Sequence, residues 1–190
     1  MGKEIDLLCN YPQGSRNLDE RATVKTQEDR AIARKFGKDF FDGDRKHGYG
    51  GFKYNPRFWE SVIPAFKKHW DLTPKNSVLD VGCAKGFMLY DMARLIPGIT
   101  VKGIDISDYA VENAKEEVRE HIMVADACRL PYEDHSFDVV ISINTIHNLD
   151  EPECRQALQE IQRVNRGKSF VTVDAFRNDE EKERMYKWNL

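Results

Sequence analysis

The chain has 190 residues, 41% of them hydrophobic and 32% charged, which is typical of one globular domain with a modest appendage. The 29 basic and 32 acidic residues give a net charge of −3, which disfavours a nucleic-acid-binding protein because such proteins need a basic face. The sequence has no apolar run of about 18 residues, and its four cysteines form no Cys-x-x-Cys pair. We therefore expect a cytoplasmic protein without membrane insertion, metal or disulfide bonds.

The first part of the chain differs from the rest. Residues 1–54 form a polar, glycine-interrupted extension, and residues 55–190 form the main domain. One helix is expected in the extension, from about Thr26, its N-cap, to Phe36. A second helix should begin at Asn55-Pro56, run to about Trp70 and bend at Pro64.

From residue 77 onward, short apolar runs alternate with helical patterns. The predicted strands are 77–81, 100–104, 122–125, 137–143 and 169–174, and the predicted helices are 86–96, 108–118, 150–164 and 179–188. This alternation predicts an α/β fold with a doubly wound, mostly parallel sheet covered on both faces. A ligand is expected at the carboxyl ends of the strands, where the strand order reverses.

The strongest chemical signal is the segment 78–86, Val-Leu-Asp-Val-Gly-Cys-Ala-Lys-Gly. A buried strand carries an acid near its end, and small residues then form a turn that opens a helix. Gly82 and Gly86 let the backbone approach a ligand closely. The turn has neither the Gly-x-Gly-x-x-Gly dinucleotide fingerprint nor a Gly-Lys-Ser/Thr phosphate loop. Taken alone, Asp80 can also be an acid that caps a backbone turn, and Cys83 a small filler.

Three further signals follow the later strands. Asp105 ends the second strand, where a carboxylate can accept hydrogen bonds from both hydroxyls of a ribose. Asp126 follows the third strand, where an acid can accept a hydrogen bond from an adenine amino group. The fourth strand leads into residues 144–149, which read Asn-Thr-Ile-His-Asn-Leu.

In this order, the four signals resemble the class I S-adenosylmethionine-dependent methyltransferases, in the type 11-like subgroup that acts mostly on small molecules. Val-Leu-Asp-Val-Gly-Cys-Ala-Lys-Gly is similar to the first family motif, and Gly-Ile-Asp-Ile-Ser to the second. Ala-Asp-Ala and the later Leu-Pro-Tyr-Glu-Asp-His-Ser-Phe-Asp-Val-Val resemble the stretch between strands three and four. The resemblance covers about Ser77 to Asp174. It implies S-adenosylmethionine as cofactor and S-adenosylhomocysteine as product.

The chain departs from the family pattern at two places. Ala84 replaces the middle glycine of the first motif, which is tolerated where the backbone is not left-handed. Asn165-Arg166-Gly167-Lys168 replaces the usual Pro-Gly-Gly before strand five, which concerns a turn and not the cofactor.

The resemblance also implies roles for individual residues. Asp80 would hold the amino group of the methionine part, Asp105 the ribose and Asp126 the adenine. Asn144 lies where a backbone carbonyl often meets the methionine ammonium. The other implied cofactor-binding residues line the methionine part or lie beside the ribose and adenine: Gly82, Cys83, Ala84, Gly86, Ile106 and Ala127.

The glycine-rich segment from Gly43 to Asn55 interleaves glycines with aromatic and cationic residues and has no helix or strand pattern. It can be a surface loop or a mobile lid over cofactor and acceptor. Tyr49 in this segment and His147 after strand four are the candidate catalytic residues. His147 would act as a general base if the acceptor must lose a proton, although histidine is common here across different substrates.

We therefore expect methyl transfer to an oxygen or nitrogen of a small-molecule acceptor, such as an anionic or sugar-type metabolite, and no nucleic-acid partner. Two alternatives stay open: a non-catalytic S-adenosylmethionine-binding subunit that activates a partner, and a nicotinamide-dependent oxidoreductase. The residues after Asp174 leave no room for the last two strands of the family's sheet. One edge of the sheet should then lack its usual cover. We expect that the chain is shortened from a longer protein; the alternative is that a second subunit covers this edge, as in a homodimer.

Overall fold

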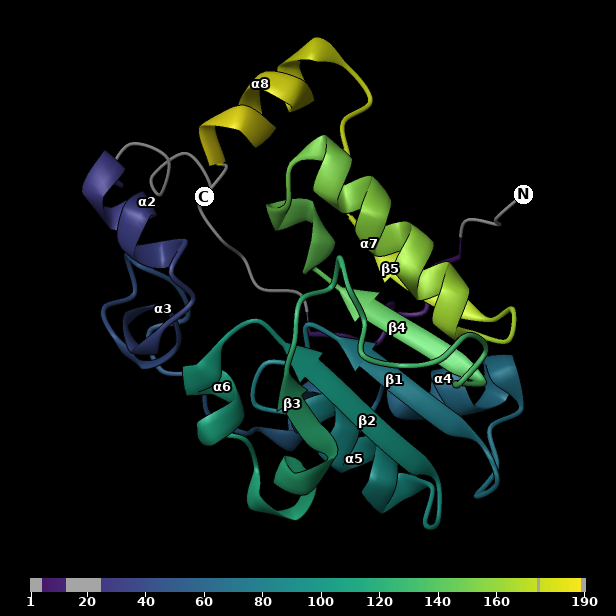
Figure 1. The fold of residues 1–190 in the computed structure, drawn as a ribbon. Coiled ribbons are helices and arrows are strands. Elements are labelled where there is room, and N and C mark those ends of the chain that lie inside the picture. The colour runs from purple at the N-terminus through teal and green to yellow at the C-terminus, as the bar shows by residue number, and fades with distance from the viewer. Residues whose placement is uncertain (1–4, 13–24, 174, 189–190) are drawn as a thin grey trace.

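The computed structural model describes residues 5–12, 25–173 and 175–188, and a sheet flanked by helices lies at its centre (Figure 1). All pairings within this sheet are parallel, in the order β3-β2-β1-β4-β5. The strands are β1 (Ser77–Val81), β2 (Thr100–Asp105), β3 (Ile122–Val124), β4 (Val139–Ile143) and β5 (Ser169–Thr172). The predicted doubly wound parallel sheet is confirmed, with five strands in the described residues.

Each face of the sheet has its own hydrophobic core. Helices α4 (Ile63–Trp70) and α5 (Phe87–Leu95) cover one face, and α7 (Glu151–Val164) covers the other. Successive strand residues point to opposite faces, so Val78 lies in the first core and Leu79 in the second. Burial of both faces explains why the strands read as continuous apolar runs.

Two of the helices begin with the same arrangement of hydrogen bonds. In α2 and again in α7, the N-cap side chain bonds the N3 backbone while the N3 side chain bonds back, through Thr26 with Asp29 and Asp150 with Glu153. The other elements are α2 (Gln27–Ala33), α3 (Lys38–Asp42), η1 (Pro56–Phe58), α6 (Asp108–Glu112), η2 (Glu116–His121), η3 (Ile146–Asn148) and α8 (Asp179–Trp188).

Two predicted helices are interrupted. Between residues 55 and 70 the chain forms the short turn η1 and then α4, which begins only at Ile63. Pro64 lies in the first turn of α4 and does not bend it, because a backbone N–H has no helical partner there. The helix expected over residues 108–118 ends at Glu112, and the Lys115 N–H donates to the Lys85 carbonyl at 2.9 Å.

The N-terminal elements lie near the carboxyl ends of the strands. Figure 1 shows α3 beside α6 and α2 beside α3, and residues of α3 contact those of both helices. Residues 43–55 contain neither helix nor strand, as expected. Among the described helices, none has the length and apolar character needed to cross a membrane.

Candidate functional site

The reversal of strand order occurs beside β1, which lies between β2 and β4. Gly82 follows β1 with a φ of 85°. A Cβ at this position would lie 2.1 Å from Thr145 Oγ1, just after β4. The Thr145 side chain occupies this space, so only glycine fits where the ends of β1 and β4 meet.

The loop after β1 is fixed to the end of β2 by hydrogen bonds. Gly82 N and Cys83 N both donate to the Ile104 carbonyl, at 2.8 and 3.0 Å. Ala84 N donates to Asp105 Oδ2 at 2.7 Å, and Ser107 N donates to Asp105 Oδ1 at 2.9 Å. The Ile106 N–H also interacts with this carboxylate. A carboxylate offers about four lone-pair sites, so Asp105 keeps the capacity to accept a further donor such as a ribose hydroxyl.

The backbone at Ala84 is left-handed, which is the conformation in which alanine is a poor replacement for the middle glycine of the motif. Its φ is 49°, in the left-handed region, where the methyl group of alanine is crowded by backbone. The bond from its N–H to Asp105 holds this conformation in place. The first motif thus keeps the shape that a glycine adopts easily, at a conformational cost of about 1 kcal/mol.

Asp80 lies within β1, two residues before Gly82, and is 5% exposed. Burial, together with the nearby charge of Asp105, raises its pKa to about 8. A neutral carboxyl at pH 7 is converted to a carboxylate when a cation arrives, so this group suits an ammonium ligand. Burial likewise raises the pKa of the Cys83 thiol, which therefore stays protonated and packs as a small apolar side chain.

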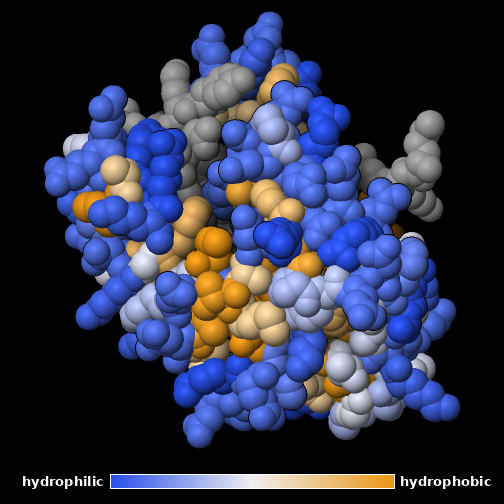
Figure 2. All heavy atoms as spheres, in the orientation of Figure 1, coloured by the Kyte–Doolittle hydropathy of each residue, from blue (hydrophilic) through white to orange (hydrophobic). Residues whose placement is uncertain are grey.

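The predicted ribose and adenine residues come together at one corner of the sheet. Asp105 pairs in register with Val124, so the residues that follow β2 and β3 are neighbours. Ile106 is 57% exposed, and Asp126 is exposed with its Oδ1 accepting from Cys128 N at 2.8 Å. Ala127 is half-buried. Figure 2 shows an apolar patch on this face over β3, where Ile106, Met123 and Val124 are exposed.

The end of β4 is held by β5. Asn144 has a φ of 52°, and its N–H donates to Thr172 Oγ1 at 2.9 Å. The Thr172 hydroxyl in turn donates to Asn144 Oδ1 at 3.0 Å. His147, in η3, is half-buried. Tyr49 packs against Phe52 with ring centroids 4.3 Å apart, so its ring belongs to the aromatic core of the glycine-rich segment.

An ionic cluster that was not predicted from the sequence lies at the loop after β1. Lys85 is 7% exposed, and its Nζ donates to Asp42 Oδ2 at 2.5 Å and to the Phe52 carbonyl at 3.2 Å. Tyr109 also donates to Asp42 Oδ2, at 2.7 Å. The sequence offers one indication of this cluster, the position of Lys85 within a loop of small residues. A lysine that is buried in such a loop requires an anionic partner.

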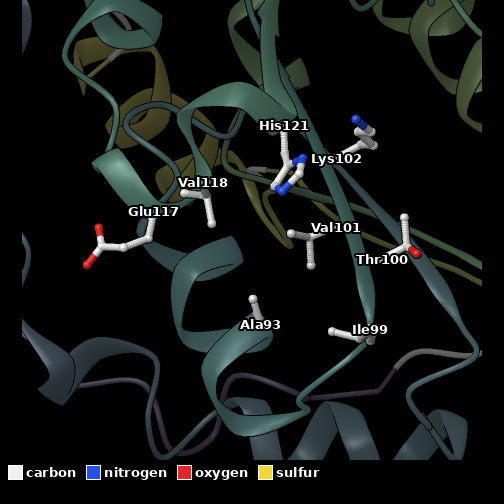
Figure 3. A pocket seen from close by; sticks show the side chains of 8 residues that line it. All are labelled: Ala93, Ile99, Thr100, Val101, Lys102, Glu117, Val118 and His121. Carbon is white, nitrogen blue, oxygen red and sulfur yellow. The ribbon is translucent and has the colours of Figure 1, made fainter.

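A groove of about 270 Å³ lies elsewhere, along the first half of β2 (Figure 3). Its lining includes Ala93, Val101 and Val118, with Lys102 and His121 at its polar side. It begins at the amino end of β2 and is therefore separate from the crevice at the carboxyl ends. In the described part of the chain, no group of three or more His, Cys, Asp or Glu side chains could hold a metal ion.

Comparison with known proteins agrees with this geometry. Residues 79–173, half of the chain, match the family model described as a methyltransferase domain. The tRNA (carboxymethyluridine(34)-5-O)-methyltransferase of Arabidopsis thaliana is 30% identical over 72% of this chain and 36% of that protein. The 27-O-demethylrifamycin SV methyltransferase of Amycolatopsis mediterranei is 35% identical over 48% of this chain and 35% of that protein.

A solved structure, that of the MccD protein, aligns with a TM-score of 0.52 and 26% identity, over 67% of this chain and 60% of that one. The chain spans about a third of the length of the two curated relatives. The family match covers the strand-end residues described above, from Leu79 to Val173. The chain therefore belongs to the class I S-adenosylmethionine-dependent methyltransferases of the type 11 kind, a family whose methyl donor is S-adenosylmethionine.

Proposed function

We propose that this chain transfers the methyl group of S-adenosylmethionine to an oxygen or nitrogen of a small-molecule acceptor. The proposal is supported mainly by the geometry of Asp105 at the carboxyl end of β2. One of its carboxylate oxygens accepts a hydrogen bond from Ala84 N, and the other accepts one from Ser107 N. The carboxylate keeps lone-pair capacity beyond its backbone bonds, which a ribose hydroxyl could use. When bound, S-adenosylmethionine supplies a methyl group on a sulfonium sulfur, an electrophile that needs alignment more than activation.

The residues present fit such a cofactor. Asp80 would become ionised opposite the ammonium of the methionine part, close to the loop that begins at Gly82. Asp105 would hold the ribose, and Asp126 would accept from the adenine amino group while Ile106 covers the ring. Backbone around Cys83, Ala84, Gly86, Ala127 and Asn144 completes the contacts that we propose.

On the acceptor side, His147 and Tyr49 are the proposed catalytic residues. His147 follows β4 and is half-buried, so its imidazole could take a proton from an acceptor hydroxyl or amine. Tyr49 is 39% exposed on the N-terminal segment and could orient the acceptor through its hydroxyl. Neither group is required to activate the cofactor, because the sulfonium is already electrophilic.

A small-molecule acceptor is supported by the net charge of −3 and by the relative named for 27-O-demethylrifamycin SV. The similarity to a tRNA methyltransferase over 72% of the chain makes tRNA the second candidate acceptor. Family membership removes the nicotinamide-dependent oxidoreductase as an alternative. A non-catalytic subunit that activates a partner is distinguished by the assay below.

The first test is calorimetric titration with S-adenosylhomocysteine. The wild-type chain should bind, and Asp105→Ala should bind at least tenfold more weakly, because two charge-assisted hydrogen bonds are lost. Glu112→Gln, an exposed acid on α6, is the matched control and should bind as the wild type does. Equal affinity in Asp105→Ala would refute the ribose assignment.

The second test is methyl transfer by the isolated chain. Anionic and sugar-type metabolites and bulk tRNA are offered with labelled S-adenosylmethionine at 50 and 200 mM salt. Incorporation into small molecules with little salt dependence supports the proposal, whereas steeply salt-dependent incorporation into tRNA favours the second candidate. Binding of S-adenosylhomocysteine without any transfer until a partner is added would favour the non-catalytic subunit.

A further inference from the structure

Asp42, the last residue of α3, receives hydrogen bonds from three separate parts of the chain. Its Oδ2 accepts from Lys85 Nζ at 2.5 Å and from the Tyr109 hydroxyl at 2.7 Å. Its Oδ1 accepts from Phe52 N at 2.9 Å. We call Asp42, Lys85 and Tyr109 the Asp42 cluster. It joins the N-terminal segment to the loop after β1 and to α6.

The contacts of the N-terminal segment lie on both sides of Asp105. Lys85 directly follows Ala84, whose N–H donates to Asp105. Ser107, whose N–H also donates to Asp105, gives its hydroxyl hydrogen to the carbonyl of Phe36. The segment from Phe36 to Phe52 is therefore hydrogen-bonded to Ser107, which donates to Asp105, and to Lys85, the neighbour of the other donor.

The charges in this cluster depend on one another. The Lys85 side chain is only 8% exposed, so its ammonium has lost most of its hydration and relies on Asp42 and the Phe52 carbonyl. Burial alone would raise the pKa of Asp42, but the hydrogen bonds from Lys85 and Tyr109 lower it to about 2. Asp42 is thus ionised, and removing its charge leaves the buried Lys85 side chain without its anionic partner in the loop after β1.

Aromatic side chains also attach the N-terminal segment to α5. Phe52 stacks on Phe87, the first residue of α5, with ring centroids 4.9 Å apart. The Tyr54 hydroxyl donates to the buried Asp91 at 2.7 Å. Although residues 43–55 have no regular secondary structure, their position over the loop and helix that follow β1 is specified by side-chain contacts.

We propose that Asp42 is a positioning residue for methyl transfer, which acts through Lys85 and Tyr109 to hold the segment 36–54 closed against the cofactor loop. This inference rests on the proposed function. Closure and cofactor binding then share the loop that carries Ala84 and Lys85, so each stabilises the other. By thermodynamic reciprocity, the factor by which closure strengthens cofactor binding equals the factor by which cofactor strengthens closure.

The test combines calorimetry with hydrogen exchange, and S-adenosylhomocysteine is the probe. In the wild type, the probe should slow exchange of the amides of residues 49–52, two of which donate to Phe40 and Phe41 carbonyls. Asp42→Asn keeps the side-chain shape but removes the charge that Lys85 needs. We expect it to bind the probe about tenfold more weakly and to lose the probe-induced slowing, because a charge-assisted bond is lost.

Lys46→Met is the matched control. Lys46 pairs with Asp29 within the N-terminal region, and its side chain is 47% exposed. This variant should bind the probe with wild-type affinity. Lys85→Arg, which keeps the charge, should retain affinity within a few-fold, whereas Lys85→Met should match Asp42→Asn. The double variant Asp42→Asn with Lys85→Met should lose little more than either single variant, as expected for one shared interaction.

Faster exchange of the segment in Asp42→Asn, with unchanged affinity for the probe, would overturn the inference and leave Asp42 a purely structural residue. A wild-type chain that does not bind S-adenosylhomocysteine at all would overturn the proposed function together with this inference, so the two failures are distinguishable.

Discussion

The ionisation of Asp80 should make the stability of the folded chain depend on pH. Its folded-state pKa of about 8 lies above the value of 3.8 for a free aspartate, so the folded chain binds more protons between about pH 4 and 8. Stability contributed by this group is therefore lost as pH rises through that window. Asp80→Asn should remove this loss and raise the Tm more at pH 8 than at pH 5, measured by scanning calorimetry.

The ionisation of Asp80 should also make the affinity for S-adenosylhomocysteine depend on pH. If the ammonium of S-adenosylhomocysteine binds opposite ionised Asp80, binding releases a proton, and wild-type affinity should rise from pH 6 to pH 8. Asp80→Asn should bind more weakly and should lose this dependence. Titrations in buffers of different ionisation enthalpy would reveal the released proton. A wild-type affinity independent of pH would place the ammonium away from Asp80.

Ala84 provides a test of backbone strain. Its φ of 49° disfavours a residue with a Cβ, whereas glycine adopts this region readily. Ala84→Gly should raise the free energy of unfolding by up to about 1 kcal/mol, the left-handed penalty offset in part by the greater freedom of glycine when unfolded. Urea denaturation would measure the change. A loss of stability would mean that packing of the methyl group outweighs the strain.

At the scale of elements, the start of α7 is the clearest local interaction. Asp150 accepts from Glu153 N at 2.9 Å and is exposed, so its contribution is a helix cap with little packing. Asp150→Ala should lower the free energy of unfolding by about 1 kcal/mol. Asp150→Asn and Asp150→Ser, which can still accept this bond, should restore most of it. Equal destabilisation by all three variants would contradict the capping role.

At the scale of the whole molecule, β5 forms one edge of the sheet in the described residues. Its backbone can pair with another strand, and Val173 just beyond it is 50% exposed. We predict a homodimer through this edge, visible in sedimentation as association that increases with protein concentration. Val173→Lys should shift the equilibrium toward monomer, whereas Val124→Lys at the opposite edge should not. A monomer at every concentration would contradict this prediction.

The sequence by itself determined the parts of this protein that depend on neighbouring residues. Apolar runs of a few residues specified the strands, because both faces of a parallel sheet are buried. Thr26 with Asp29, and Asp150 with Glu153, specified two helix starts, because each cap needs partners only three residues away. The position of Asp105 at a strand end followed from the same local pattern and is confirmed.

The tertiary structure alone decided what depends on distant residues. Asp42 and Lys85 lie 43 positions apart, and no periodicity or local motif relates them. The left-handed backbone of Ala84 is held by Asp105, and the helix expected after Asp108 stops early near the bond between Lys115 N and the Lys85 carbonyl. These contacts require residues that are far apart in the sequence and come together only when the strands assemble. No short stretch of sequence is therefore sufficient to predict them.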